Sequence, residues 1–136
     1  MSHFSEFTCK MTSEKYLVMA LEEMGFKGKI EVHEIAKQLY GYQGDLRQQK
    51  AHIIIRKQYV GNASNDIGFE KMPDGTFRIW ISDYDKAKYN QKWIEKLKTT
   101  YSYLKINDAA KKKGYMTTFK KDEEKGKITL TLSRWV

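Results

Sequence analysis

Residues 51–83 contain the clearest period-two alternation in the chain and predict three consecutive β-strands. The first strand is centred on the isoleucine run 53–55, which is rich in β-branched side chains and too short for a helix. A polar connection at 61–65 leads to a second strand at about 67–70, where apolar residues again alternate with others. We therefore expect an antiparallel meander on which the rest of the chain packs.

The second and third strands of this meander are joined by a turn at residues 72–75. Pro73 presets φ at the second turn position, and Gly75 ends the turn. The return strand separates its residues by face, with Phe77, Ile79 and Ile81 on one side and Thr76, Arg78, Trp80 and Ser82 on the other. We expect the first of these faces to be core.

Helical periodicity predicts two amphipathic helices. The first is capped by Thr12 or Ser13 and ends at Gly25. The second is long, from about 90 to 113, and ends in three lysines followed by Gly114. Their apolar stripes comprise Leu17, Ala20, Leu21 and Met24 in the first helix and Trp93, Ile94, Leu97, Tyr101 and Leu104 in the second.

Weaker alternation completes the prediction. It indicates strands at 2–8 and 29–33 and a last hairpin that joins 115–120 to 127–135. Residues 34–39 suit one helical turn as well as an extended segment. The expected fold is α+β, a predominantly antiparallel sheet of about five to seven strands with two amphipathic helices packed on it. The predicted core is Leu17, Leu21, Ile30, Val32, Ile53, Ile55, Ile67, Phe69, Phe77, Ile79, Ile81, Leu97, Leu104, Ile128, Leu130 and Leu132.

Length and composition restrict this fold to one domain, residues 1–136. A chain of 136 residues with one proline and no low-complexity linker has the size of a single domain. No apolar run approaches the ~20 residues of a membrane-spanning helix, and the N-terminus lacks the apolar segment of a signal peptide. We expect a soluble, cytoplasmic protein without membrane insertion. Cys9 is the sole cysteine, which excludes an intrachain disulfide and fits a reducing compartment.

The net charge of +8 suggests an anionic partner, but the type of basic residue weakens that interpretation. Four of the 25 basic residues are arginines, so 21 are lysines, spread along the whole chain. Specific recognition of phosphate and bases favours the planar arginine fork over lysine. Solvated surface lysines therefore explain the charge at least as well as an anion site does.

The sequence contains no assembled catalytic set. Its three histidines have no metal-ligand spacing, and Cys9 has no neighbouring base. Asp83 and Asp85 suit magnesium, although two such carboxylates are more commonly a solvated lead into a helix. Gly41 and Gly44 match no nucleotide-binding fingerprint. We expect no enzymatic activity, no cofactor and no bound metal.

Binding residues are predicted on the noncore side of two strands. Arg78 accompanies Trp80 on one strand, and Arg134 accompanies Trp135 on the other. If the long helix covers both tryptophans, this side is a second core. If the rings are exposed, they suit an anchor for a protein partner or a stacking platform for single-stranded nucleic acid.

A lysine run gives a second candidate contact. Lys111, Lys112 and Lys113 lie at the negative end of the long helix, where they either cap the helix dipole or contact an anion. On this basis we expect a small nonenzymatic binding or regulatory protein that acts through a host protein. Nucleic-acid binding through a basic surface and exposed aromatics is the alternative, and the oligomeric state is left open.

Several short motifs together resemble the Ycf35 family, also called DUF1257, of cyanobacteria, plastids and cyanophages. They are residues 1–5, 20–25 and 41–44, Ala51 with the isoleucine run, residues 66–69, and Arg134 with Trp135. The chain departs from the family pattern at His52, where an acidic residue is usual, and at Tyr84, where tryptophan is common. The resemblance implies a lineage tied to oxygenic photosynthesis and supplies no established activity.

Overall fold

The computed structural model describes the backbone of residues 3–122 and 127–134, with side chains for 3–6, 10–115 and 131. Five antiparallel strands form one sheet in the order β1-β5-β4-β3-β2, and two further strands pair separately. The sheet strands are β1 (Phe4–Cys9), β2 (Ile30–Tyr40), β3 (Leu46–Ile55), β4 (Ile67–Lys71) and β5 (Phe77–Ser82). The separate hairpin joins β6 (Tyr115–Asp122) to β7 (Lys127–Arg134). The predicted α+β class and the central meander β3-β4-β5 are confirmed.

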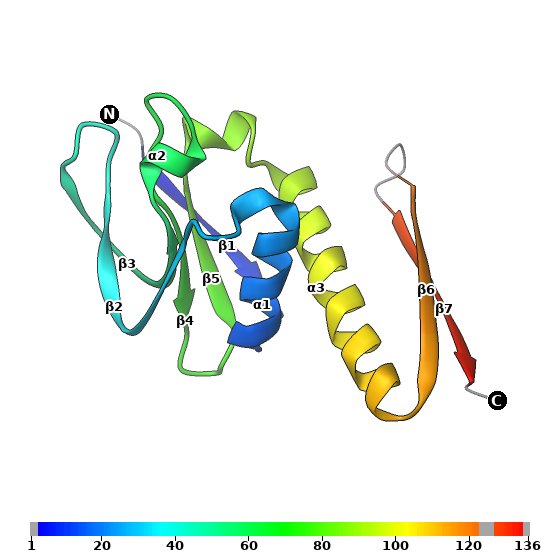
Figure 1. Cartoon of the computed structure of the whole chain (residues 1–136). Coiled ribbons are helices and arrows are strands. Elements are labelled where there is room, and N and C mark those ends of the chain that lie inside the picture. Colours follow the sequence, from blue (N-terminus) through cyan, green and yellow to red (C-terminus); the bar gives the residue numbers. More distant parts are fainter. Residues whose placement is uncertain (1–2, 123–126, 135–136) are drawn as a thin grey trace.

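The two expected helices are α1 (Glu14–Leu21) and α3 (Gln91–Lys112). Ser13 caps α1 by accepting a hydrogen bond from the Tyr16 backbone N–H. Helical structure continues through the π-helical turn η1 (Glu22–Phe26), where Gly25 adopts a φ of 105° that favours glycine. Short helical turns α2 (Lys57–Val60) and η2 (Asp85–Ala87) complete the order. Figure 1 shows α1 and α3 on one side of the sheet and the β6–β7 hairpin beyond α3.

The main core lies between the sheet and these two helices. The alternation of β5 is confirmed, because Phe77, Ile79 and Ile81 are buried while Arg78 and Trp80 remain partly exposed. The same core contains Met11, Leu17, Ala20, Leu21, Phe26, Ile53, Ile55, Val60, Ile67, Phe69, Phe77, Ile79, Ile81, Tyr89, Ile94, Leu97, Tyr101 and Leu104. The removal of this much apolar surface from water is the largest favourable contribution to the stability of the fold.

A second, smaller apolar cluster lies on the other face of the sheet. It contains Leu39, Ala51 and Ile54, with Phe4 and Trp80 packed against it. Gly68 of β4 lies beneath this cluster, since a Cβ on Gly68 would approach the Ala51 Cβ to 2.6 Å. The β2–β3 hairpin therefore contributes apolar side chains above a strand that carries no side chain at the point of contact.

Strand β2 differs from the sequence prediction in two respects. Pairing with β3 shifts between Val32 and Lys37, so that β2 carries a bulge there. Val32, predicted to be core, lies opposite the buried Ile53 but is 49% exposed, because β2 is the terminal strand of the sheet. Residues 34–39, for which a helical turn was one alternative, are part of the strand.

Asp85 is a third difference. It is buried rather than solvated, because its Oδ2 accepts hydrogen bonds from the Ser82 hydroxyl and the Asn65 backbone N–H. Asp83 is exposed, as we expected for a residue that leads into a helix. Ile128, Leu130 and Leu132 of the predicted core lie outside the described side chains. Within the described ranges, none of the helices has the length and apolar character that crossing a bilayer requires.

Candidate binding face

Trp80 is held in a defined orientation on the sheet face opposite the helices. The strand registers place it in a row across the sheet that runs Glu6, Trp80, Gly68, Ile54 and Glu31. Its indole Nε1–H donates a hydrogen bond to Glu70 Oε1 at 3.1 Å. One side of the ring packs against the second apolar cluster. The ring is therefore partly buried, with its polar edge satisfied within the sheet.

Arg78 lies beside this ring on the same face. Its guanidinium carbon is 5.3 Å from the Trp80 ring centroid, a cation–π arrangement. Arg78 also pairs with Glu6 at 3.0 Å and with Glu70 at 3.8 Å. The two carboxylates neutralise the guanidinium locally and restrict its orientation. Arg78 and Trp80 thus form one ordered unit, which we call the Arg78–Trp80 pair.

The sequence left two alternatives for this face: α3 covers the tryptophan, or the ring is exposed. The structure fits neither for Trp80, because other strands cover part of the ring. The cluster that packs on Trp80 comes from β2, β3 and β1, whereas the long helix α3 packs in the core on the other face. Arg47 of β3 lies over the Phe4 ring of β1, with its guanidinium carbon 5.5 Å from the centroid. The β2–β3 hairpin therefore crosses this face, and Arg78 lies beside the covered part.

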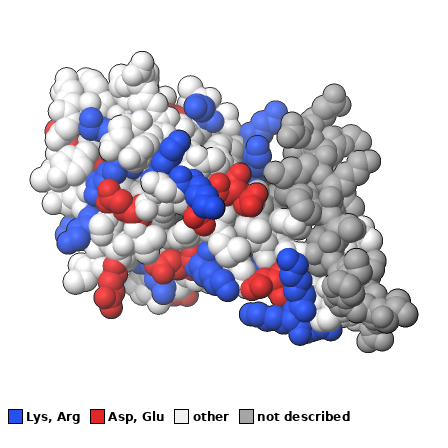
Figure 2. All heavy atoms as spheres, viewed as in Figure 1, with Lys and Arg blue, Asp and Glu red and all other residues white. Residues whose placement is uncertain are grey.

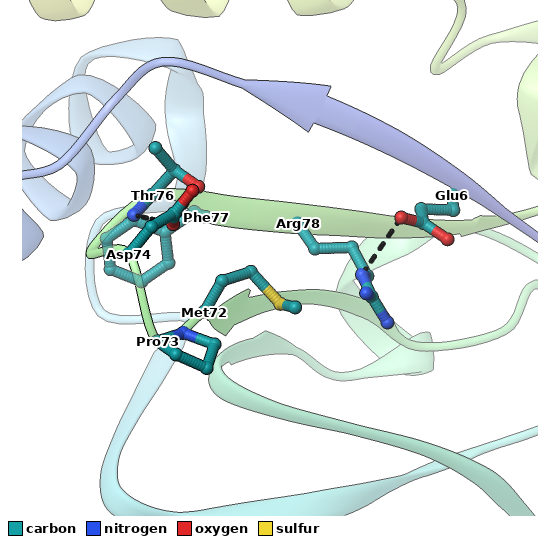
Figure 3. A pocket seen from close by; sticks show the side chains of 7 residues that line it. All are labelled: Glu6, Met72, Pro73, Asp74, Thr76, Phe77 and Arg78. Atoms are coloured by element: carbon teal, nitrogen blue, oxygen red, sulfur yellow. Dashed lines mark hydrogen bonds and ion pairs between the residues drawn. The ribbon is translucent and has the colours of Figure 1, made fainter.

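A pocket adjoins the Arg78–Trp80 pair at the β4–β5 turn. Figure 3 shows the seven residues that line it: Glu6, Met72, Pro73, Asp74, Thr76, Phe77 and Arg78. Its volume is about 340 Å³. Thr76 donates hydrogen bonds to Asp74 from both its backbone N–H and its hydroxyl, which fixes the turn at one wall. The apolar wall of Met72 and Pro73 suits an apolar side chain, and Glu6 and Arg78 supply polar groups at the other end.

The lysine run lies elsewhere, at the C-terminal end of α3. Lys111, Lys112 and Lys113 are all exposed. Lys112 Nζ is 3.6 Å from Asp108, which also accepts a hydrogen bond from the Tyr16 hydroxyl. This hydrogen bond is the main reason that the pKa of Asp108 lies below its usual range. Figure 2 shows Lys and Arg gathered near this end of α3, whereas basic and acidic residues alternate over the rest of the visible face.

Of the two tryptophans predicted to form a binding surface, Trp80 is the one that the structure describes. Trp135 lies outside the described residues, and the Arg134 side chain is likewise not described. The candidate site that can be built from the described residues is therefore the Arg78–Trp80 pair with its neighbouring pocket.

An ionic network around the buried Asp66, which the sequence did not reveal, joins β2 to the end of β3 and the start of β4. Arg56 donates from Nε and Nη2 to the two carboxylate oxygens of Glu31, at 2.8 and 2.9 Å, and from Nη1 to Asp66 Oδ2 at 2.8 Å. Asp66 is fully buried and also accepts hydrogen bonds from the backbone N–H groups of Tyr40 and Lys57. The hydrogen bonds from Arg56 lower the pKa of Glu31 and raise that of Arg56.

This network connects strands, and the buried Asp66 carboxylate has hydrogen-bond donors on both oxygens. We therefore expect it to stabilise the arrangement of these strands. His33 extends it, with Nε2 at 2.8 Å from Glu31 Oε1. Among the described residues, no group of three or more His, Cys, Asp or Glu side chains is arranged to hold a metal ion. The one sequence signal for the network was Asp66 directly before an apolar strand, which alone does not reveal its partners.

Comparison with protein families gives a match over most of the chain. A family model described as "Protein of unknown function (DUF1257)" matches residues 20–131, a range that includes β2 to β5 and all of α3. No curated protein and no solved structure matches the chain.

Proposed function

Because the chain belongs to the DUF1257 family, whose description assigns no activity, we propose from its own residues that it is a nonenzymatic binding or regulatory protein. Its partner is a host protein, which docks on the Arg78–Trp80 pair. The resemblance to Ycf35 supports a cyanobacterial, plastid or cyanophage lineage, and with it a cytoplasmic or stromal location.

The observation that supports this proposal most is the restraint on the Arg78–Trp80 pair. The Trp80 indole is fixed by Glu70, and the Arg78 guanidinium lies against the ring. Tryptophan and arginine are the residue types that most often dominate the energetics of protein interfaces. Side chains that are already ordered lose little conformational entropy when a partner binds, so their contacts contribute more fully to affinity.

The charges around the pair favour a protein partner over nucleic acid. Arg78 is flanked by Glu6 and Glu70, and Asp74 lines the neighbouring pocket. The two carboxylates that pair with Arg78, together with Asp74 at the turn end of the pocket, repel a phosphate backbone. The same surroundings suit a partner segment that inserts an apolar side chain into the pocket and presents a basic or neutral group beside it.

Nucleic-acid binding is the second candidate, and the exposed lysine run at the end of α3 supports it. Lys111 and Lys113 are exposed, and Lys112 shares Asp108 with Lys15. The run is compact and made of lysine, which suits nonspecific contact with phosphates. It lies on a different element from the Arg78–Trp80 pair, so the two candidates are separable by mutation.

Capture from a cyanobacterial lysate at low and moderate salt, with and without nuclease treatment, tests the two candidates together. The immobilised wild-type chain is compared with Trp80→Phe, which keeps most of the packing, and with the triple change of Lys111, Lys112 and Lys113 to alanine. A protein partner that is retained at moderate salt, lost with the Trp80 change and kept with the triple change supports docking on the pair. Capture that depends on the lysines and falls steeply with salt supports nucleic-acid binding instead.

A further inference from the structure

The charged side chains that line the pocket at the β4–β5 turn do not balance one another. Glu6 and Arg78 form an ion pair at 3.0 Å. Asp74 also lines the pocket, and within the described residues it has no ion-pair partner. Hydrogen bonds from the Thr76 hydroxyl and backbone N–H hold the pKa of Asp74 below its ordinary value, so its carboxylate is ionised at neutral pH. The pocket therefore offers a negative charge to a ligand.

One oxygen of the Asp74 carboxylate is open to that ligand. Both hydrogen bonds from Thr76 go to Oδ1, at 2.9 Å from the backbone N–H and 2.6 Å from the hydroxyl. They fix the orientation of the carboxylate, and in the described part of the chain no donor from another residue binds Oδ2. Asp74 is exposed at the surface, so a cation can approach Oδ2 without any change in the fold.

The rest of the pocket suits an aliphatic chain. Met72 and Pro73 form an apolar wall, with Asp74 at one end and the Glu6–Arg78 ion pair at the other (Figure 3). The pocket volume of about 340 Å³ is enough for one long side chain. Contact with the wall removes apolar surface of the ligand from water, which favours binding. A complementary ligand therefore combines an apolar stem with a cationic end.

We propose that this pocket binds a lysine side chain of the protein partner, with the methylene stem against Met72 and Pro73 and the ammonium group at Asp74 Oδ2. The assignment rests on the proposed function, because it names the residue that a partner docked on the Arg78–Trp80 pair inserts here. Lysine commonly lays its stem along apolar surface while its charged head stays in water. One lysine thus supplies both the apolar and the basic group that the pocket accepts.

The hydrogen bonding of Asp74 favours lysine over arginine. A guanidinium pairs best with a carboxylate through two parallel hydrogen bonds, which need both oxygens. Because Oδ1 of Asp74 already accepts two hydrogen bonds from Thr76, the carboxylate offers Oδ2 alone. An ammonium group is a compact point charge, for which one oxygen is sufficient.

Nuclear magnetic resonance titration of the full chain with capped amino acids tests this site without the partner. The probe is Nα-acetyl-lysine N-methylamide, added to tens of millimolar because a ligand of this size binds weakly. We expect saturable shifts of the backbone amide signals of Gly75 and Thr76. The capped norleucine, which has the stem without the ammonium group, and the capped arginine should each bind about three-fold more weakly or worse.

Asp74→Asn is the diagnostic variant, because its amide oxygen still accepts the hydrogen bonds from Thr76 while the charge is lost. It should raise the dissociation constant of the lysine probe by about three-fold or more and leave that of the norleucine probe unchanged. Asp83→Asn is the matched control, since it makes the same change at an exposed carboxylate outside the pocket. It should alter neither dissociation constant.

The lysine site and the proposed function can fail separately. Absence of saturable shifts at Gly75 and Thr76, or equal affinities of the wild type and Asp74→Asn for the lysine probe, would overturn the lysine site. Capture of a host protein that is lost with Trp80→Phe would still support the proposed function in that case. Saturable lysine binding that Asp74→Asn weakens supports the site even where capture does not depend on Trp80.

Discussion

Arg56 Nη1 donates a hydrogen bond of 2.8 Å to Oδ2 of Asp66, a carboxylate with no exposed surface. Asp66 also accepts hydrogen bonds from two backbone N–H groups, so it joins the end of β3 to the start of β4 and to the end of β2. Buried charges are tolerated only when they are paired and hydrogen-bonded in this way. The network therefore fixes how the β2–β3 hairpin lies across the sheet.

Asp66→Ala should lower the free energy of unfolding by about 3 to 5 kcal/mol, because Arg56 Nη1 and two backbone donors lose the carboxylate that accepts their hydrogen bonds. Urea titration followed by circular dichroism measures this loss. Asp83→Asn is the control, since Asp83 is exposed and solvent screens its ion pair with Lys86, which should contribute little to stability. Equal losses of unfolding free energy for the two variants would show that the network around Asp66 does not stabilise the fold.

The folded protein should lose stability in acid because Glu31 becomes protonated. The hydrogen bonds from Arg56 lower the folded-state pKa of Glu31 below its ordinary value of 4.5. A group whose pKa falls on folding stabilises the protein above its unfolded pKa, and this contribution is lost as the pH drops through the folded pKa. Stability should therefore decline below about pH 4.5, and Glu31→Gln should decline less steeply. If the curves of unfolding free energy against pH are parallel for the two proteins, this loss of stability does not come from Glu31.

Gly68 should not tolerate a side chain. A Cβ at this position would come within 2.6 Å of the Ala51 Cβ and 2.8 Å of a Leu39 methyl. Gly68→Ala should therefore destabilise the protein by about 1 to 3 kcal/mol through overpacking. Combining it with Ala51→Gly removes the closest contact, so the double variant should lose less than the two single losses added together. Additive losses in thermal melts would show that the two positions are not in contact.

Ile79 and Val32 differ in burial although the sequence predicts both as core. Ile79 is fully buried on β5, whereas Val32 is 49% exposed on β2. Ile79→Ala should cost about 2 to 5 kcal/mol and Val32→Ala less than about 1 kcal/mol in chemical denaturation. A larger loss at Val32 than at Ile79 would mean that the faces of the sheet are misassigned.

The contrast between these two residues shows where sequence reasoning succeeds. Alternation identifies the faces of β4 and β5, and Ser13 with Gly25 marks the ends of the first helix, because these signals depend on neighbouring residues. Val32 was misassigned because alternation identifies the face of a residue but not the place of its strand: Val32 is 49% exposed on the terminal strand β2, although its partner Ile53 is fully buried. Ile54 illustrates the same difficulty, since its burial depends on a hairpin that crosses the second face of the sheet.

The candidate site was predictable in its residue types but not in its surroundings. Alternation placed Arg78 and Trp80 on one face of β5, and the structure confirms that they are neighbours there. Their carboxylate partners Glu6 and Glu70 lie on β1 and β4, so only the strand order brings them together. The burial of Asp85 likewise depends on Asn65 and Ser82, which come from two different segments.

The affinity of the captured host protein for single-site variants decides whether the Arg78–Trp80 pair is the docking site. Arg78→Ala and Trp80→Phe should each weaken binding by about 1 to 2 kcal/mol or more in isothermal titration calorimetry, while thermal melting shows a folded protein. Changing Lys111, Lys112 and Lys113 together to alanine should leave the affinity within about 0.5 kcal/mol of wild type, with little dependence on salt. Unchanged affinity for the Arg78 and Trp80 variants, with binding abolished in the lysine variant, would contradict the account.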